Sequence, residues 1–316
     1  MAYLLIHGDL PTEIELAQFR DTLSHATLPS QIFEIIDNIK SGHPMDVLRT
    51  CVSALAALEP KSSDTSETEF LKNGQRLMAQ VPQIVAAHHA IRNGRQPITP
   101  DPSLPFAANW LYMLKGERPS EDAARLADVD FILHAEHGAN ASSFAARVTV
   151  STDANMHAAI TTALATLSGP AHGGAAEDVM AMVEEIGSPE NAANYVKSKR
   201  KNREAVTGFG HRVYRVEDPR ARHMRAGVEQ LSQEMGQPQW YEILQAVVEA
   251  MAPYSRHGLN VNVDFYSGVI YQLHGLPKDL YVPIFAIGRM PGWIVQCLEQ
   301  HARNILIRPL TLYDGP

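Results

Sequence analysis

The sequence has few of the features that mark metal-binding, secreted or membrane proteins. It contains only two cysteines, Cys51 and Cys297, far apart and in apolar surroundings. Without a CxxC motif or a cysteine–histidine spacing, the chain shows neither a zinc signature nor a disulfide framework and is typical of a reducing cytosol. No apolar run approaches the roughly 20 residues of a membrane span. We therefore expect a cytoplasmic protein with no membrane partner, and the opening MAYLLIHGDLP predicts a helix rather than a signal peptide.

Positive charge is not in excess either. With 27 Lys+Arg against 35 Asp+Glu, the net charge is −8, which repels nucleic acid. An anionic ligand must therefore be held by local arginines. The basic run from Lys197 to Arg203 is typical of a solvated helix face, or it attracts a nucleotide phosphate together with Arg212 and Arg215. Nucleic acid as a partner is disfavoured by the overall charge and by the lack of interleaved aromatics.

Strand patterns are nearly absent, and only residues 259–266 (LNVNVDFY) alternate apolar and polar side chains. Helix patterns recur instead, beginning with a capping box at Thr12 and Glu15. At 316 residues and 45% hydrophobic content, the sequence predicts a mainly α protein with one large helical core. The predicted helices cover roughly 12–23, 29–41, 45–60, 68–92, 105–115, 120–137, 141–150, 154–168, 175–186, 189–204, 219–235, 238–252, 264–274 and 279–302.

Two breaks predict a division into domains. Gly173-Gly174 and Gly275-Leu276-Pro277 have the composition of hinges. We expect a large helical domain formed by residues 1–174 and 276–316 and a smaller helical domain formed by residues 175–275.

The segment TGFGHRVYRVEDPRARHMR (207–225) carries the strongest chemical signal. It places His211 just after two loop glycines and Arg220 nine residues later. Asp218-Pro219 predicts a helix start, with Asp as N-cap and Pro at the first helical position. A proton-transfer group and an anion-binding group thus share one loop–helix unit, which suits a small charged substrate of an enzyme.

Two further histidine motifs lie at predicted helix ends. In HAEHGAN (134–140), the spacing of His134 and His137 predicts one shared helix face that ends at Gly138. A metal site there lacks a third ligand, so a substrate hydrogen bond or a structural role is favoured. In SGPAHGGA (168–175), His172 precedes a helix whose N-terminus would keep the imidazole neutral, able to donate a hydrogen bond to an enolate. A surface role for His172 stays open.

Three charged residues stand among apolar neighbours. Asp264, between Val263 and Phe265, is either a general base or a helix N-cap, and both roles are compatible. Arg289 and Arg308 are lone arginines in FAIGRMPGW and NILIRPL. Because an unpaired buried charge is costly, each should meet a carboxylate ligand or an acidic neighbour.

Taken together, these segments resemble citrate synthase. HAEHGAN, GPAHGG, GFGHRVYRVEDPR, NVDFYSG, FAIGRMPGW and IRP occur in that family's order, and the resemblance runs along the whole chain. It implies the family's two-domain helical fold and a Claisen-type condensation of acetyl-CoA with oxaloacetate, followed by hydrolysis of citryl-CoA. It further implies that Asp264 removes a methyl proton, His172 stabilises the enol and His211 acts on the oxaloacetate carbonyl.

The resemblance also implies the binding residues. His137, Arg220, Arg289 and Arg308 would hold the oxaloacetate and citrate carboxylates, with Arg308 supplied by the partner subunit of a homodimer. The smaller domain would carry the CoA-binding loop, with Gly208, Gly210 and Arg215. No metal and no permanently bound cofactor are expected, and acetyl-CoA is a co-substrate of this tricarboxylic acid cycle reaction. Family members usually begin earlier, so we expect their N-terminal segment to be missing here.

Two alternatives stay open at this level. A 2-methylcitrate synthase would use propionyl-CoA on the same residues, and one methylene in an acyl pocket is worth only about 1–3 kcal/mol. A non-catalytic helical paralogue that binds ligands or partners would need none of the three catalytic residues, which speaks against it.

Overall fold

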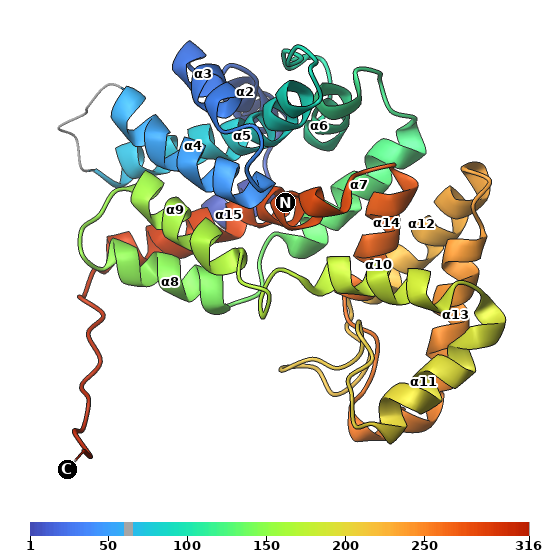
Figure 1. Cartoon of the computed structure of the whole chain (residues 1–316). Helices are drawn as coiled ribbons and strands as arrows, with labels where there is room; N and C mark the ends of the chain where they lie inside the picture. The colour runs from blue at the N-terminus through green and yellow to red at the C-terminus, as the bar shows by residue number, and fades with distance from the viewer. Residues whose placement is uncertain (60–65, 316) are drawn as a thin grey trace.

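The computed structural model describes residues 1–59 and 66–315 and consists of packed α-helices (Figure 1). Within these ranges the only β pairing is an isolated bridge between Phe209 and Val261. No helix there is long and apolar enough to cross a membrane. The α-helices are α1 (Ala2–His7), α2 (Glu13–Ser24), α3 (Ser30–Asn38), α4 (Pro44–Leu58), α5 (Glu67–Arg92), α6 (Phe106–Lys115), α7 (Glu121–His134), α8 (Ala141–Val150), α9 (Met156–Leu167), α10 (Ala175–Ile186), α11 (Ala192–Lys201), α12 (Ala221–Glu234), α13 (Gln239–Met251), α14 (Asp264–Leu273) and α15 (Tyr281–Ala302). Short 3-10 helices are η1 (Pro189–Asn191), η2 (Ala252–His257) and η3 (Lys278–Leu280).

The mainly α fold is confirmed, and the predicted helices agree with the structure to within a few residues. The capping box at α2 is also confirmed. The Thr12 hydroxyl accepts a hydrogen bond from the Glu15 backbone N–H (3.3 Å), and the Glu15 carboxylate accepts one from the Thr12 N–H (2.8 Å). These bonds satisfy donors that an open helix start leaves unpaired.

Residues 259–266, the best candidate for a strand in the sequence, do not form one. Only Val261 pairs across to Phe209, and α14 already begins at Asp264. The reason is burial, because Phe265, Tyr266, Val269 and Ile270 are all 0% exposed, as in a helix surrounded by other helices. A short apolar run of this kind does not distinguish strand from helix.

The predicted helix start at Asp218-Pro219 is also wrong by two residues. Helix α12 begins at Ala221, and Arg220 occupies the N-cap position without a side-chain cap. The Asp218 carboxylate instead accepts from the backbone N–H of Arg220 (3.0 Å) and from its guanidinium. Asp218 therefore orients an arginine rather than closing a helix.

Helix α15 runs through the middle of the molecule and contacts α5, α7, α8 and α9 (Figure 1). Two glycines allow a close approach along it. A Cβ at Gly292 would lie less than 3.0 Å from the Ala135 carbonyl, and one at Gly288 would touch the Cα of Phe131. The end of α7 and the loop after it are thereby held directly against α15.

Helices α10 to α14 gather on one side of the molecule, where α10 and α12 pack on α14 and α11 packs on α13 (Figure 1). They coincide with the segment expected to form the smaller domain, but α12 and α14 also contact α7, and α10 contacts α15. The division at 174 and 275 stays a prediction.

Candidate active site

Segments far apart in the sequence bring six of the predicted site residues into one electrostatic neighbourhood. Arg289 interacts with Arg220 and Asp264, and His172 interacts with Arg289 and Asp264. His211 interacts with Arg220 and Asp264, and His137 with Arg220, His211 and Arg289. The loop after α7, the turn before α10, the segment before α12, the first residue of α14 and the middle of α15 all contribute. These six residues therefore form the candidate site.

His172 lies in the turn between α9 and α10 and contacts Ser142, which is fully buried at the start of α8. The Ser142 backbone N–H donates to Nε2 of His172 (3.3 Å), and the Ser142 hydroxyl lies 2.8 Å from the same nitrogen. Because a backbone N–H can only donate, Nε2 is the acceptor and Nδ1 carries the ring proton. Trp293 in turn donates to the Ser142 hydroxyl (3.0 Å). The site thus holds one tautomer of His172.

The pKa of His172 is lowered from its ordinary 6.5, chiefly by burial and then by the positive charge of Arg289. The expected neutral imidazole is therefore found. Its cause differs from the expected one, since α10 begins only at Ala175 with Gly174 as its N-cap.

His211 is held by its own loop. Its Nδ1 accepts from the backbone N–H groups of Val213 (3.0 Å) and Tyr214 (3.2 Å), so that the neutral ring carries its proton on Nε2. Burial and the neighbouring Arg220 lower the pKa of His211. A neutral ring with Nε2–H is a donor for a carbonyl oxygen.

His134 and His137 do not share a helix face, contrary to the prediction, because α7 ends at His134 and His137 lies in the following loop. His134 is 1% exposed, and its Nδ1 lies 2.9 Å from the Asp130 carbonyl oxygen. His137 points elsewhere, with its Nε2 lying 3.0 Å from the Tyr214 hydroxyl and its ring lying edge-on to His211 at 5.1 Å. Over residues 1–59 and 66–315 no group of three or more His, Cys, Asp or Glu side chains has metal-site geometry.

The pKa of His137 is lowered from 6.5 to about 4 by burial, by Arg220 and by His211, in that order. His137 is therefore neutral at physiological pH. Three neutral histidines line this site.

Asp264 is the first residue of α14, and Val263 occupies the N-cap position, so the N-cap hypothesis for Asp264 is wrong. The residues before it are tied to the glycine loop at 208–210. Asn262 donates from its backbone N–H to the Gly208 carbonyl (2.9 Å) and from its side chain to the Gly210 carbonyl (3.1 Å). These bonds hold Asp264 beside the segment that carries His211.

Gly208 and Gly210 both adopt positive φ, at 82° and 89°, which L side chains rarely do. A Cβ at Gly208 would come within 2.5 Å of the Phe265 ring. Glycine at 208 is therefore required for the loop to pack on α14. Arg215, the third residue expected to hold CoA, is exposed, and its carbonyl accepts from Asn260 (3.0 Å).

Arg289 is 2% exposed inside α15, and burial lowers its pKa from 12.5 to about 10. Its Nε donates to the His134 carbonyl, and its guanidinium lies over the Phe285 ring at 4.8 Å. In the part of the chain that the structure describes, no carboxylate lies within salt-bridge distance of Arg289. A buried cation in this position favours an anionic ligand.

Arg308 does not reach this site, and the expectation of a buried arginine at 308 is wrong for the single chain. It is exposed in the tail that leaves the body after α15 (Figure 1). The start of the tail is anchored, since Asn304 donates to the Val150 carbonyl (3.2 Å) and Ile307 N–H donates to the Ser151 hydroxyl (3.0 Å). Beyond Ile307 the tail extends away from the helices of the chain (Figure 1).

Three residues that contact the site side chains were not predicted from the sequence. They are Ser142, Tyr214 and, as the partner of Arg220, Asp218. Ser142 follows the HAEHGAN motif and Tyr214 lies inside GFGHRVYRVEDPR, but a hydroxyl residue in such a place is too common a signal to select either one. Only the structure places each hydroxyl against a site histidine.

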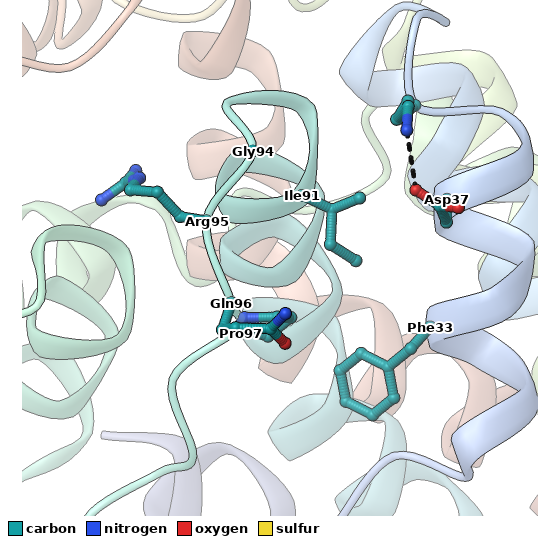
Figure 2. A pocket seen from close by; sticks show the side chains of 8 residues that line it. Phe33, Asp37, Ile91, Gly94, Arg95, Gln96 and Pro97 are labelled. Atoms are coloured by element: carbon teal, nitrogen blue, oxygen red, sulfur yellow. Dashed lines mark hydrogen bonds and ion pairs between the residues drawn. The ribbon is translucent and has the colours of Figure 1, made fainter.

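A cavity of about 530 Å³ lies outside this site, between α3 and the end of α5 (Figure 2). Phe33 and the ion-paired Asp37 and Lys40 (2.9 Å) line one side, and Ile91 lies opposite. None of the predicted site residues contributes to its lining. The candidate active site is therefore defined by its charged residues and not by this cavity.

Known proteins resemble this chain along nearly its whole length. Residues 1–310 match the family model described as citrate synthase, C-terminal domain. A citrate synthase of Synechocystis is 42% identical over 100% of this chain and 80% of its own length. A 2-methylcitrate synthase of Mycobacterium tuberculosis is 39% identical over 100% of this chain and 80% of its own.

The chain belongs to the citrate synthase family. Solved structures support the assignment, including a citrate synthase from Pyrobaculum aerophilum with a TM-score of 0.92 and 34% identity, covering 100% of this chain and 82% of that one. A citrate synthase from Thermoplasma acidophilum, solved with carboxymethyl coenzyme A and oxaloacetate, also has a TM-score of 0.92, with 29% identity and coverage of 100% and 84%. As a member of the citrate synthase family the protein is an enzyme of the transferase type, and not the non-catalytic paralogue considered above.

Proposed function

We propose that this citrate synthase family member condenses acetyl-CoA with oxaloacetate and releases citrate and CoA. The observation that carries the proposal is the neutral, tautomer-fixed pair His172 and His211 beside Asp264. An α-proton of a thioester is weakly acidic. A base therefore needs a hydrogen-bond donor on the carbonyl oxygen at the same moment.

The residues divide the reaction between them. Asp264 takes a methyl proton of acetyl-CoA, while Nδ1–H of His172 stabilises the oxygen of the resulting enol. The enol carbon attacks the oxaloacetate carbonyl, and Nε2–H of His211 donates its proton to the oxygen that becomes the citrate hydroxyl. The proton that Asp264 took from the methyl group then returns through solvent to His211, which restores both residues. Water then cleaves the citryl thioester to citrate and CoA. No permanently bound cofactor takes part.

The cationic residues suit the second substrate. Arg220 and the buried Arg289 offer charge-assisted hydrogen bonds to the oxaloacetate carboxylates, with His137 as a neutral donor beside them. Gly208, Gly210 and Arg215 form the CoA side. We further propose a cytoplasmic homodimer in which Arg308 enters the partner's site. The exposed apolar side chains of the tail support this proposal: Ile305, Leu306, Leu310, Leu312 and Tyr313.

The proposal is tested by measuring CoA-thiol release with purified protein, oxaloacetate and either acetyl-CoA or propionyl-CoA. We expect the higher kcat/KM with acetyl-CoA. A clear preference for propionyl-CoA would make the protein a 2-methylcitrate synthase. This second candidate is supported by the similarity to enzymes of that name. Absence of thiol release with both acyl-CoAs from folded protein would refute both candidates.

A further inference from the structure

We propose that Tyr214 is a positioning residue of the oxaloacetate subsite, whose hydroxyl sets the tautomer of His137. The inference rests on the proposed function for its substrate. The effect of Tyr214 on the His137 tautomer is a property of the protein without ligand and does not depend on the proposed function.

The contact joins two separate parts of the chain. Tyr214 lies in the segment before α12, and His137 lies in the loop after α7. The hydroxyl is 3.0 Å from His137 Nε2, and the rings lie 5.6 Å apart at 64°. This is normal hydrogen-bond geometry between two half-buried side chains.

The direction of this hydrogen bond follows from its chemistry. His137 is neutral, so one ring nitrogen accepts and the other donates. A phenol is the better donor and an imidazole nitrogen the better acceptor. Tyr214 therefore donates to Nε2, and the ring proton stays on Nδ1. The His137 ring is left with a single donor, which is what a carboxylate or carbonyl oxygen of oxaloacetate requires.

Tyr214 also contacts His211. Its ring stacks on the His211 ring with centroids 4.7 Å apart and an interplanar angle of 28°, and its backbone N–H donates to His211 Nδ1 (3.2 Å). One residue thus touches both histidines on the oxaloacetate side. Those two histidine rings lie edge-on to each other, 5.1 Å apart, and Tyr214 contacts both of them.

A purely structural role for the hydroxyl is disfavoured by the surroundings. Tyr214 lies between exposed residues, with Val213 66% and Val216 70% exposed, and it is not part of the buried core. Removal of the hydroxyl should therefore change the site without unfolding the protein.

The test compares Tyr214→Phe with the wild type and with Tyr112→Phe on α6 as a matched control. Losing one hydrogen bond between neutral groups should raise the dissociation constant and the KM for oxaloacetate about 3- to 10-fold. The KM for acetyl-CoA and the melting temperature should stay at wild-type values, and Tyr112→Phe should change none of these quantities. An unchanged affinity for oxaloacetate in Tyr214→Phe would overturn the inference.

A double-mutant cycle separates a positioning role from a merely structural one. If Tyr214 acts through His137, then Tyr214→Phe should cause no further loss of affinity in a His137→Ala background. The same loss in both backgrounds would refute it. Nitrogen-15 NMR of the ligand-free protein should show His137 protonated at Nδ1 in the wild type and a mixture of tautomers in Tyr214→Phe. If the wild type bound no oxaloacetate, the proposed function would fail, and the NMR result alone would still decide the role of Tyr214.

Discussion

The buried carboxylate of Asp218 holds the guanidinium of Arg220 through two hydrogen bonds, 3.0 Å from Nε and 2.7 Å from Nη2. Asp218 is 0% exposed. Burial alone would raise its pKa, but the hydrogen bonds and charge of Arg220 outweigh burial and lower the pKa below the ordinary 3.8. The pair presents the remaining Nη1 donors of Arg220 to a ligand in a fixed direction.

Asp218→Asn should lower the free energy of unfolding at pH 7 by about 2–4 kcal/mol, because it leaves a nearly buried arginine without its counter-charge. Since the folded pKa lies below 3.8, this stabilisation is complete above that pH and is lost as the pH falls through the folded value. Urea titrations at pH 7 and pH 3 should therefore show a smaller difference between variant and wild type at pH 3. Asp37→Asn removes the exposed ion pair with Lys40 and should change stability by less than about 1 kcal/mol. An equal loss for Asp218→Asn at both pH values would contradict this account.

The pH dependence of activity should reflect three histidines with lowered pKa values. Because His137, His172 and His211 have folded pKa values below 6.5, all three stay neutral above that pH. We expect kcat/KM to show no histidine titration between about pH 7 and 8 and to fall below about pH 6.5, as the rings gain protons and lose their acceptor nitrogens. An inflection above pH 7 that disappears in His172→Gln or His211→Gln would show that the pKa of that ring is raised and not lowered.

Asp264→Asn should abolish exchange of the acetyl-CoA methyl protons with solvent, since the amide cannot accept a proton. The rate of exchange should fall about 100- to 10,000-fold, the range that a positioned general base contributes. Oxaloacetate binding should persist, because Asp264 carries none of the donors that hold its carboxylates. His211→Ala is the comparison, expected to lose condensation while it stays folded in the proposed dimer. The measurement is exchange of the methyl protons, followed by NMR in deuterated buffer. Normal turnover by Asp264→Asn would exclude Asp264 as the base.

Gly208→Ala should disrupt the packing of the glycine loop on α14. The positive φ costs about 1–2 kcal/mol for a residue with a side chain, and contact with Phe265 adds about 1–3 kcal/mol. Gly236→Ala is the matched control, because its φ is +64° but nothing lies within 4 Å of its Cβ position. We expect Gly208→Ala to lose more stability in urea titrations and to raise the KM for acetyl-CoA. Equal effects of the two substitutions would mean that the Phe265 contact contributes nothing.

If the proposed homodimer shares its sites, two inactive variants should complement each other. Arg308→Ala should lose activity through the partner's site, and His211→Ala through its own. After subunit exchange in a 1:1 mixture, half of the dimers are mixed and each has one complete site, so about a quarter of wild-type activity should return. Each variant exchanged with itself should stay inactive. If Arg308→Ala were inactive and no mixture recovered activity, Arg308 would act within its own chain.

Much of the fold could be predicted from the sequence because most helices are marked by local patterns that have a single structural meaning. The capping box at Thr12 and the apolar spacing of most helices have the same meaning in any surroundings. The segment at 259–266 failed because its alternation is short and its apolar residues are buried on all sides, where strand and helix patterns coincide. The helix start at Asp218 failed because a nearby guanidinium competed for the carboxylate.

The candidate site, like the fold, could be predicted only in part. The sequence by itself determined which residues are proposed to carry the chemistry, because their motifs and the order of these motifs resemble those of citrate synthase. Only the tertiary structure decided the tautomers of His172 and His211, the pairing of Arg220 with Asp218, and the contacts of Tyr214 with two histidines. These features depend on distances of about 3 Å between residues from distant parts of the chain, and on burial that lowers a histidine pKa. Spacing along a sequence does not encode either quantity.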